Sequence, residues 1–417
     1  MENNKTPSIR FKGFTDPWEQ RKLLSCIEKI TDFRGRTPKK LGMDWSESGY
    51  LALSALNVKD GYIDFSQDVH YGEQALYDKW MSGNELHKGQ VLFTTEAPMG
   101  NVAQVPDNKR YILSQRTIAF DVKEDIITEN FLATLLRSPA VFNTLTSLSS
   151  GGTAKGVSQK SLAGVDIQIP VELREQELLA TYFANLDNLI TLHQRKYNKL
   201  LNVKKSMLEK MFPKNGSNIP EIRFKGFTDP WEQRKLGELA DIVGGGTPST
   251  GVSDYWDGDI DWYAPAEIAE QIYLTSSQRK ITEEGYNHSS AKMLPVGTVL
   301  FTSRAGIGKT AILIQKGCTN QGFQSIVPHK IELDSYFIFS RTEELKQYGE
   351  TVGAGSTFVE VSGKQMANME LMMPKTIAEQ KTIGQYFASL DNLITLHQRE
   401  LEKLQNIKKS MLEKMFV

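Results

Sequence analysis

The sequence predicts an α+β fold: two mixed α/β domains, separated by two long helices packed as an antiparallel coiled coil, with an internal pseudo-twofold repeat. The chain has 417 residues, more than the ~250–300 that one hydrophobic core usually serves. The stretch IRFKGFTDPWEQRKL occurs at 9–23 and again, unchanged, at 222–236. A second repeat, helical in pattern, occupies 182–212 and 386–416. The chain therefore consists of two halves built in the same order.

The expected elements follow that order along the chain. They are an N-terminal repeat segment (1–23), a first domain (24–170), a central helix (171–212), a linker with the second copy of the repeat segment (213–236), a second domain (237–374) and a C-terminal helix (375–417).

The two long blocks between the repeats resemble each other only faintly, but in the same order. VLFTT at 91–95 corresponds to VLFTS at 299–303, and Thr37-Pro38 to Thr247-Pro248. Short apolar runs separated by Gly, Asn, Asp and Pro clusters favour strands and turns with a few helices. The blocks are therefore expected to share one fold and to present two different surfaces.

Each helical repeat places mostly apolar residues at alternating spacings of four and three, as in a heptad seam. In the first copy these residues are Leu186, Ile190, His193, Tyr197, Leu200, Lys204, Met207 and Met211. An amphipathic helix must bury its apolar stripe, and the other copy is the obvious partner. The breaker PKNGSNIP at 213–220 permits either orientation, and we favour the antiparallel one. Packing of each helix on its own block remains an alternative.

Composition limits the class of protein. With 40% hydrophobic and 24% charged residues the chain is of ordinary globular type, and its net charge of -1 gives no general attraction to nucleic acid. Any nucleic-acid contact must come from a local patch. No run approaches the ~20 apolar residues of a membrane span, and the start has no signal core, so we expect a cytoplasmic protein without membrane contact. Cys26 and Cys318 cannot form a disulfide framework or a four-cysteine zinc site.

Motifs for catalysis are weak. SRAGIGKT at 303–310 ends like a phosphate-binding loop but has Ser303 where the pattern requires glycine, which favours a turn between strands. Asp257, Asp259 and Asp261 fit a solvated turn with an adjoining strand better than a metal site. The histidines form no HExxH or His/Cys cluster. We expect a non-catalytic chain without a metal.

Several segments together carry a family resemblance. They are the two RFKGFTDPWEQRKL openings, GGGTPS at 244–249 with its weaker counterpart GRTPKK at 35–40, the pairs Glu175-Gln176 and Glu379-Gln380, and LDNLITLHQR in duplicate. In this order, over nearly the full length, the chain resembles the specificity (S) subunit of type I restriction-modification enzymes. One departure is that the first block lacks the glycine triplet before Thr-Pro. Gly35 and Arg36 precede Thr37-Pro38 there.

The resemblance implies a DNA reader with two target recognition domains, each reading half of a split, asymmetric site in double-stranded DNA. The two helices would set the spacing and dock two modification (methyltransferase) subunits. Those partners would carry S-adenosylmethionine, and restriction (translocase and nuclease) subunits would add ATP- and Mg-dependent cleavage. The specificity chain would bind no cofactor and hold no catalytic residue.

A physical argument agrees with the resemblance. Two identical partner subunits need two identical docking surfaces, whereas two different half-sites need two different reading surfaces. Identical repeats flanking divergent blocks are what this division predicts, so the repeats should not be where DNA is read. Two rivals remain: a two-domain adaptor scaffold that binds no DNA, and a standalone enzyme that uses the aspartates at 257–261.

Arg and Lys pair with guanine, and Asn and Gln with adenine, so loops rich in these residues are candidate readers. In the first block we expect them among Arg34, Arg36, Lys39, Thr95, Gln115, Arg116, Lys155 and Lys160. In the second block the candidates are Thr247, Ser249, Arg304, Lys309, Asn320, Gln321 and Lys364. Candidates for the interface with the helical frame or a partner are Phe11, Trp18, Phe224, Trp231, Leu186, Ile190, Leu390 and Ile394.

Overall fold

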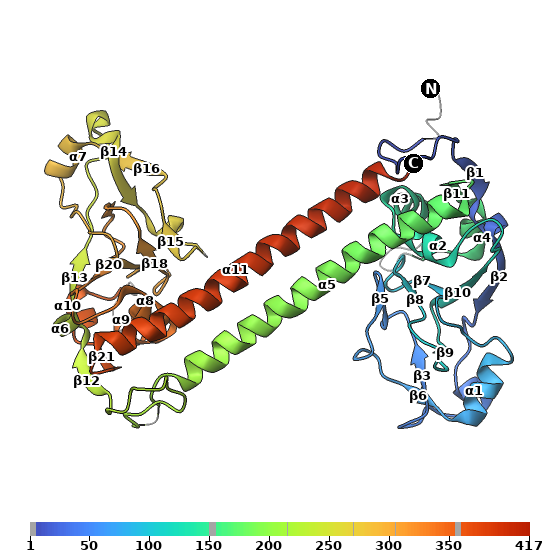
Figure 1. Cartoon of the computed structure of the whole chain (residues 1–417), viewed down its shortest axis with the longest axis horizontal. Coiled ribbons are helices and arrows are strands. Elements are labelled where there is room, and N and C mark those ends of the chain that lie inside the picture. The colour runs from blue at the N-terminus through green and yellow to red at the C-terminus, as the bar shows by residue number, and fades with distance from the viewer. Residues whose placement is uncertain (1–5, 150–155, 215, 270, 305, 355–359) are drawn as a thin grey trace. The chain divides into compact units, whose positions relative to one another are not determined.

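The computed structural model describes residues 6–149, 156–214, 216–269, 271–304, 306–354 and 360–417. Its contacts divide the chain into two units (Figure 1). The first unit comprises residues 1–194 and 399–417, and the second comprises residues 195–398. The division cuts both long helices, so each unit holds one mixed α/β domain and part of each helix.

The first unit is built on an antiparallel sheet in the order β2-β10-β7-β8. Its strands are β2 (Ile27–Asp32), β10 (Thr117–Val122), β7 (Val91–Thr94) and β8 (Val102–Gln104). Apolar side chains of the central strands, such as Phe93 and Phe120, are fully buried because helix α2 (Glu129–Leu136) packs on this sheet.

Smaller elements complete the first domain. They are β3 (Tyr50–Leu53), β6 (Tyr71–Gly72) and β9 (Ile112–Leu113) in a second sheet, the hairpin of β4 (Val58–Lys59) and β5 (Tyr62–Ile63), and the helices α1 (Gln74–Met81), α3 (Pro139–Ser147) and α4 (Gln159–Gly164). Short 3₁₀ turns lie at Leu23–Cys26 and Lys39–Leu41.

The second unit repeats the sheet order as β13-β20-β17-β18 and adds β15 at the edge. These strands are β13 (Ala240–Gly244), β20 (Gln324–Pro328), β17 (Val299–Phe301), β18 (Thr310–Leu313) and β15 (Tyr273–Leu274). The likeness that the sequence predicted between VLFTT and VLFTS therefore corresponds to equivalent central strands, β7 and β17.

The rest of the second domain differs more. It contains the sheet β16 (Arg279–Ile281), β14 (Trp256–Tyr263) and β19 (Cys318–Thr319), the helices α6 (Leu236–Leu239), α7 (Glu283–Asn287), α8 (Ser335–Ser340), α9 (Thr342–Gly353) and α10 (Gly363–Ala367), and 3₁₀ turns at Ser253–Tyr255 and Pro265–Glu267.

The two predicted long helices are α5 (Leu173–Lys210) and α11 (Ile377–Lys414), of 38 residues each. In the first unit the rings of Phe183 and Phe416 lie 5.7 Å apart, and Lys408 Nζ lies 2.7 Å from Asp187 Oδ1. From Phe183 to Asp187 the residue number rises, whereas from Phe416 to Lys408 it falls. The two helices are therefore antiparallel here.

The second unit repeats this helix contact. Lys204 Nζ lies 2.6 Å from Asp391 Oδ1, and the rings of Phe212 and Phe387 lie 6.1 Å apart. The antiparallel arrangement is confirmed within each unit. The alternative also holds over the first turns, where Gln176 binds the carbonyl of Ile126 in its own domain.

Each copy of the short repeat closes the C-terminal end of a long helix. The Ile9 amide donates to the Lys414 carbonyl (3.0 Å), and the Ile222 amide donates to the Lys210 carbonyl (2.9 Å). The last carbonyls of a helix have no partner within it, so these hydrogen bonds satisfy groups that would otherwise be unpaired. In Figure 1 the blue N-terminal segment accordingly lies beside the red end of α11.

The short repeats are also held by paired strands and by buried ion pairs. Strand β1 (Glu19–Lys22) pairs with β11 (Asp166–Ile169), and β12 (Glu232–Lys235) pairs with β21 (Glu370–Met373). Two fork-like ion pairs tie the repeats to the starts of the long helices: Arg10 Nε–Glu175 at 2.6 Å and Arg223 Nε–Glu379 at 2.7 Å. The same joint is therefore built twice.

Candidate nucleic-acid interface

Many of the predicted reading residues of the first domain gather at one edge of its sheet. Strands β2 and β7 end there and β10 begins there, because adjacent strands in this sheet are antiparallel. We call this edge the first polar edge and define it by Arg34, Arg36, Thr95, Gln115 and Arg116.

Within the first polar edge the side chains differ in how free they are. The Gln115 amide donates to the Arg36 carbonyl, and the Arg36 guanidinium carbon lies 4.3 Å from the Phe33 ring centroid. Thr95 is buried and its hydroxyl donates to the Arg116 carbonyl at 3.2 Å. Thr95 therefore shapes the loop and cannot present its hydroxyl to a base.

Arg116 is the most available cation at this edge. Its side chain is 55% exposed, and its Nε lies 3.0 Å from Glu96 Oε1. An exposed ion pair of this kind contributes little to folding stability, so Arg116 can exchange it for a contact with DNA. The backbone of Arg116 has φ +64°, a left-handed conformation that is uncommon outside glycine and clusters at functional sites.

The remaining candidates of the first domain lie around this edge. Arg34 is paired with Asp32 at 2.6 Å, and Asp32 also accepts from Gln159 at 3.1 Å. Lys160, the next residue in α4, is exposed. Lys39 is exposed at the start of the turn Lys39–Leu41. Lys155 lies outside the described residues.

The second domain brings the equivalent strand ends together with different side chains. We define the second polar edge by Thr247, Arg304, Asn320 and Gln321. The Thr247 hydroxyl donates to the Gln321 side-chain oxygen, and Asn320 Oδ1 accepts the Gly322 amide at 2.8 Å. Arg304 forms an isolated β-bridge with Glu360 and is half-exposed.

The glycine triplet at 244–246 explains part of the difference between the edges. A Cβ on Gly245 would overlap the carbonyl of Asn320, and one on Gly246 would overlap Ser290. The loop therefore packs directly against the second polar edge. Arg36, in the weaker counterpart GRTPKK, instead extends its guanidinium to the Trp80 carbonyl.

Three further candidates of the second domain have other surroundings. The Ser249 carbonyl accepts from Trp256 Nε1 at 3.1 Å. Lys309 is exposed in the turn between β17 and β18, with its amide on the Thr302 hydroxyl at 3.0 Å. Lys364 is exposed in α10.

Of the three aspartates at 257–261, Asp261 is buried and so does not fit the predicted solvated turn. Asp261 is 6% exposed and accepts the Ser277 amide (2.9 Å), with Lys280 Nζ at 3.5 Å. Burial alone would raise the pKa of Asp261, but the Ser277 and Ser276 hydrogen bonds and Lys280 hold it below its usual range. Among the described residues no cluster suited to a metal ion is found.

The frame candidates lie in the short repeats and along the two long helices. Phe11 packs edge-on against Tyr182, and Phe224 against Tyr386. Trp18 contacts Phe416 and is 1% exposed, and Trp231, 2% exposed, contacts Phe212. Both tryptophans are thus engaged within the chain. The helix candidates Leu186, Leu390 and Ile394 are buried, and Ile190 is half-buried.

Four exposed leucines were missed by the sequence reasoning. They lie outside the seam, at matching positions of the duplicated LDNLITLHQR, and their exposed fractions are 44% for Leu189, 46% for Leu192, 44% for Leu393 and 52% for Leu396. The signal that could have found them is the identity of non-seam apolar residues in both copies.

Comparisons with known proteins identify the family of this chain. The family model for the type I restriction modification DNA specificity domain matches residues 16–202 and again 228–406. Among the described residues no helix is long and apolar enough to span a membrane.

Two curated relatives come from Methanocaldococcus jannaschii. The chain is 34% identical over 192 residues to the type I restriction enzyme MjaIX specificity subunit, covering 45% of this chain and 44% of that protein's length. It is 24% identical to the putative type I restriction enzyme MjaX specificity subunit, covering 95% of this chain and 92% of the relative.

A solved structure supports the fold over the whole length. The S subunit of a type I restriction-modification system from M. genitalium superimposes with a TM-score of 0.64 at 14% identity and covers 99% of each chain. With the family model matched once in each half, the chain belongs to the family of type I restriction-modification DNA specificity proteins and carries the specificity domain twice.

Proposed function

We propose that this chain is the DNA sequence-recognition subunit of a type I restriction-modification complex, in which each domain reads one half of a bipartite asymmetric site through its polar edge. The observation that carries the proposal is the contrast between the two halves. The joints Arg10–Glu175 and Arg223–Glu379 are the same, whereas the polar edges present different side chains.

The chemistry of the edges suits base recognition. Arginine binds guanine through two acceptors in the major groove, and asparagine and glutamine bind adenine. The first polar edge offers Arg116 and Arg34, and the second offers Asn320, Gln321 and Arg304. The net charge of -1 gives the whole chain little attraction for phosphates, so partner subunits supply much of that contact.

The exposed leucines are suited to docking the modification subunits. Two copies of one modification subunit need two equivalent surfaces. The pairs Leu189/Leu192 and Leu393/Leu396 provide them, one pair on each long helix, and each pair is exposed in its own unit. Exposed apolar side chains repeated in this way are suited to burial in an interface.

Other parts of the complex follow from the same function. S-adenosylmethionine would be bound by the modification subunits, and ATP and Mg by restriction subunits. The specificity chain itself would be non-catalytic and act in the cytoplasm, where these partners meet double-stranded DNA. An adaptor scaffold that binds no DNA is the competing function, and it would leave the contrast between the polar edges without a use.

Methylome sequencing tests the proposal. Cells expressing this chain with its modification subunit should methylate a two-part asymmetric motif with a fixed gap of unspecified bases. The control is the modification subunit expressed without this chain, which should leave that motif unmodified. A continuous palindrome, or an unchanged methylome, would contradict two-domain reading.

A further inference from the structure

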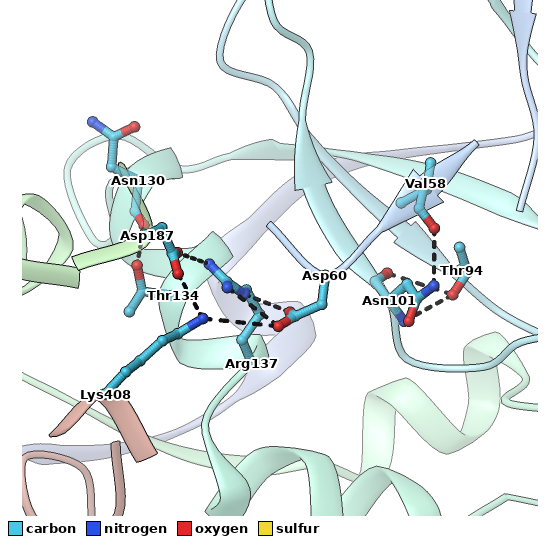
Figure 2. Close-up of polar contacts among 9 residues, drawn as sticks. All are labelled: Val58, Asp60, Thr94, Asn101, Asn130, Thr134, Arg137, Asp187 and Lys408. Atoms are coloured by element: carbon cyan, nitrogen blue, oxygen red, sulfur yellow. Dashed lines mark hydrogen bonds and ion pairs between the residues drawn. The ribbon is translucent and has the colours of Figure 1, made fainter. Parts of the chain in front are cut away.

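A hairpin of the first domain is held on the helix pair by a cluster of charges (Figure 2). Arg137, at the end of α2, places Nε 2.5 Å from Asp60 Oδ1 and Nη1 2.8 Å from Asp187 Oδ2. Lys408 Nζ lies 2.7 Å from Asp187 Oδ1. The side chains of Arg137 and Lys408 are 10% and 16% exposed, so the two cations are largely shielded from water, whereas Asp60 is 59% exposed. It joins the β4–β5 hairpin, α2, α5 and α11.

The turn of this hairpin is fitted to the guanidinium. Gly61, which follows Asp60, has φ +86°, and a Cβ there would lie 2.8 Å from Arg137 Nη2. Glycine adopts this conformation without strain and leaves room for the guanidinium. The hairpin turn and Arg137 therefore pack directly against each other.

The other side of the hairpin is connected to the first polar edge. The Asn101 side-chain amide donates to the Val58 carbonyl at 2.9 Å, and the Asn101 backbone amide donates to the Thr94 hydroxyl at 2.9 Å, as Figure 2 shows. The next residue, Thr95, donates its amide to the Arg116 carbonyl at 2.8 Å. Polar contacts joined by short stretches of backbone, at 58–60 and 94–95, thus run from α5 and α11 to Arg116.

The second unit has the helix part of this arrangement but a different domain part. Asp391 is bound by Lys204 at 2.6 Å, as Asp187 is by Lys408. Its second partner is the uncharged Tyr336 hydroxyl, at 2.8 Å. Lys309, in the turn equivalent to that of Asn101, donates its amide to the Thr302 hydroxyl. Within the described residues, a charged connection from the helix pair to a hairpin is found in the first domain and not in the second.

We propose that Asp60, Arg137 and Asn101 are positioning residues, which brace the first polar edge against the helix pair and so make the complex reject sites whose gap is changed by one base pair. The inference rests on the proposed function. One added base pair moves a half-site by ~3.4 Å and turns it by roughly 35° about the DNA axis. A braced edge cannot follow that change, whereas a released edge can.

The test uses the complete chain assembled with its modification subunits. Methylation rates are measured on DNA carrying the site with its natural gap and with one base pair added or removed. Asp60→Asn removes the negative charge that faces Arg137 and Lys408, and Asn101→Ala removes the side-chain amide that binds the Val58 carbonyl. Asp60 is exposed and Asn101 is half-exposed. Asp64→Asn is the matched control, since Asp64 lies just beyond β5, is half-exposed, and accepts from the nearby Ser66.

We expect both brace variants to keep the sequence of each half-site and to raise the rate on altered gaps, relative to the natural gap, about two- to fivefold. Asp64→Asn should match the wild type. An unchanged gap preference in both variants overturns the brace, and so does loss of methylation at every gap with normal assembly. A wild-type complex that modifies no two-part site refutes the proposed function instead, so the two failures are distinguishable.

Discussion

At the scale of single residues, exposure and backbone conformation separate the candidate readers. Thr95 is buried and Gln115 is bound to a carbonyl, whereas Arg116 is exposed and holds a strained left-handed backbone. Strain of this kind persists where the surrounding structure enforces it, here through the hydrogen bonds from Thr95 to the Arg116 carbonyl. Arg116 is therefore the first residue to test as a base reader.

Replacing Arg116 by alanine should weaken discrimination at one base of the first half-site by about 1–3 kcal/mol and leave the second half-site unchanged. The measurement is methylation of a set of single-base variants of the site. Lys109→Ala is the control, because Lys109 is 79% exposed and pairs only with nearby Asp107 among the ion pairs found. If Arg116→Ala leaves both the methylated sequence and the DNA affinity unchanged, Arg116 is not a reader.

At the scale of elements, the antiparallel helices carry one Asp–Lys pair in each unit. Asp187 meets Lys408, and Asp391 meets Lys204, so each of these two lysines faces an aspartate on the other helix. Single polar residues in an apolar seam fix register, because any slip would leave a buried charge unpaired. The lysines in the predicted seam are thus explained by their partners.

The pKa of Asp187 makes this joint sensitive to acid. Burial by itself would raise that pKa, but Arg137 and Lys408 hold it below the ordinary value of 3.8. Asp60, the other carboxylate of the cluster, faces the same arginine. The ionised form of Asp187 therefore adds stability that is complete above about pH 4, and this stability is lost as the pH falls through the lowered pKa.

Asp187→Asn should lower the free energy of unfolding at pH 7 by about 1–3 kcal/mol. The variant should also lose less stability than the wild type on acidification below about pH 4, since the titrating group is gone. Denaturant unfolding at a series of pH values measures both effects. Equal acid sensitivity of the two proteins would show that Asp187 does not carry this stability.

At the scale of the whole molecule, duplication fits the proposal that one chain docks two copies of one partner subunit. Outside the seam, Leu192 and Leu396 are identical and exposed, whereas the exposed Leu201 of the first helix corresponds to Gln405 in the second. An apolar residue retained in both copies suits a shared use. Leu201, which is replaced by glutamine in the other copy, is not suited to a use that both copies share.

At concentrations that just saturate the wild type, Leu192→Gln should shift the assembly from two modification subunits toward one, and Leu192→Gln with Leu396→Gln should leave most chains without a bound subunit. Loss of a buried leucine at an interface costs about 1–3 kcal/mol, enough to lower affinity by one or two orders of magnitude. Native mass spectrometry counts the subunits. Leu201→Gln is the control, and an equal loss with that variant would contradict a specific leucine site.

Much of the architecture could be predicted because its signals are local or repeated. A spacing of four and three residues specifies a long amphipathic helix wherever it occurs, and both helices were found where the pattern lies. The two identical repeats indicated two equivalent joints, and the two divergent blocks indicated two different surfaces. These properties need no knowledge of which residues meet.

The polar edges could be predicted only as lists of residue types. Arg116 and Thr95 both belong to loops of suitable composition, yet one is exposed and the other is buried. The difference depends on how β7 and β10 pair, which composition does not encode.

By itself the sequence determined the two-fold repetition, the long helices and the division between identical repeats and divergent blocks. The tertiary structure alone decided that the first repeat closes the end of α11, that Asp187 meets Lys408, and that Arg137 holds the hairpin at Asp60. The physical reason is the separation along the sequence over which each signal acts. Helical periodicity acts over a few residues, whereas each of these contacts joins segments far apart in the chain, selected by the pairing of buried charges and helix ends.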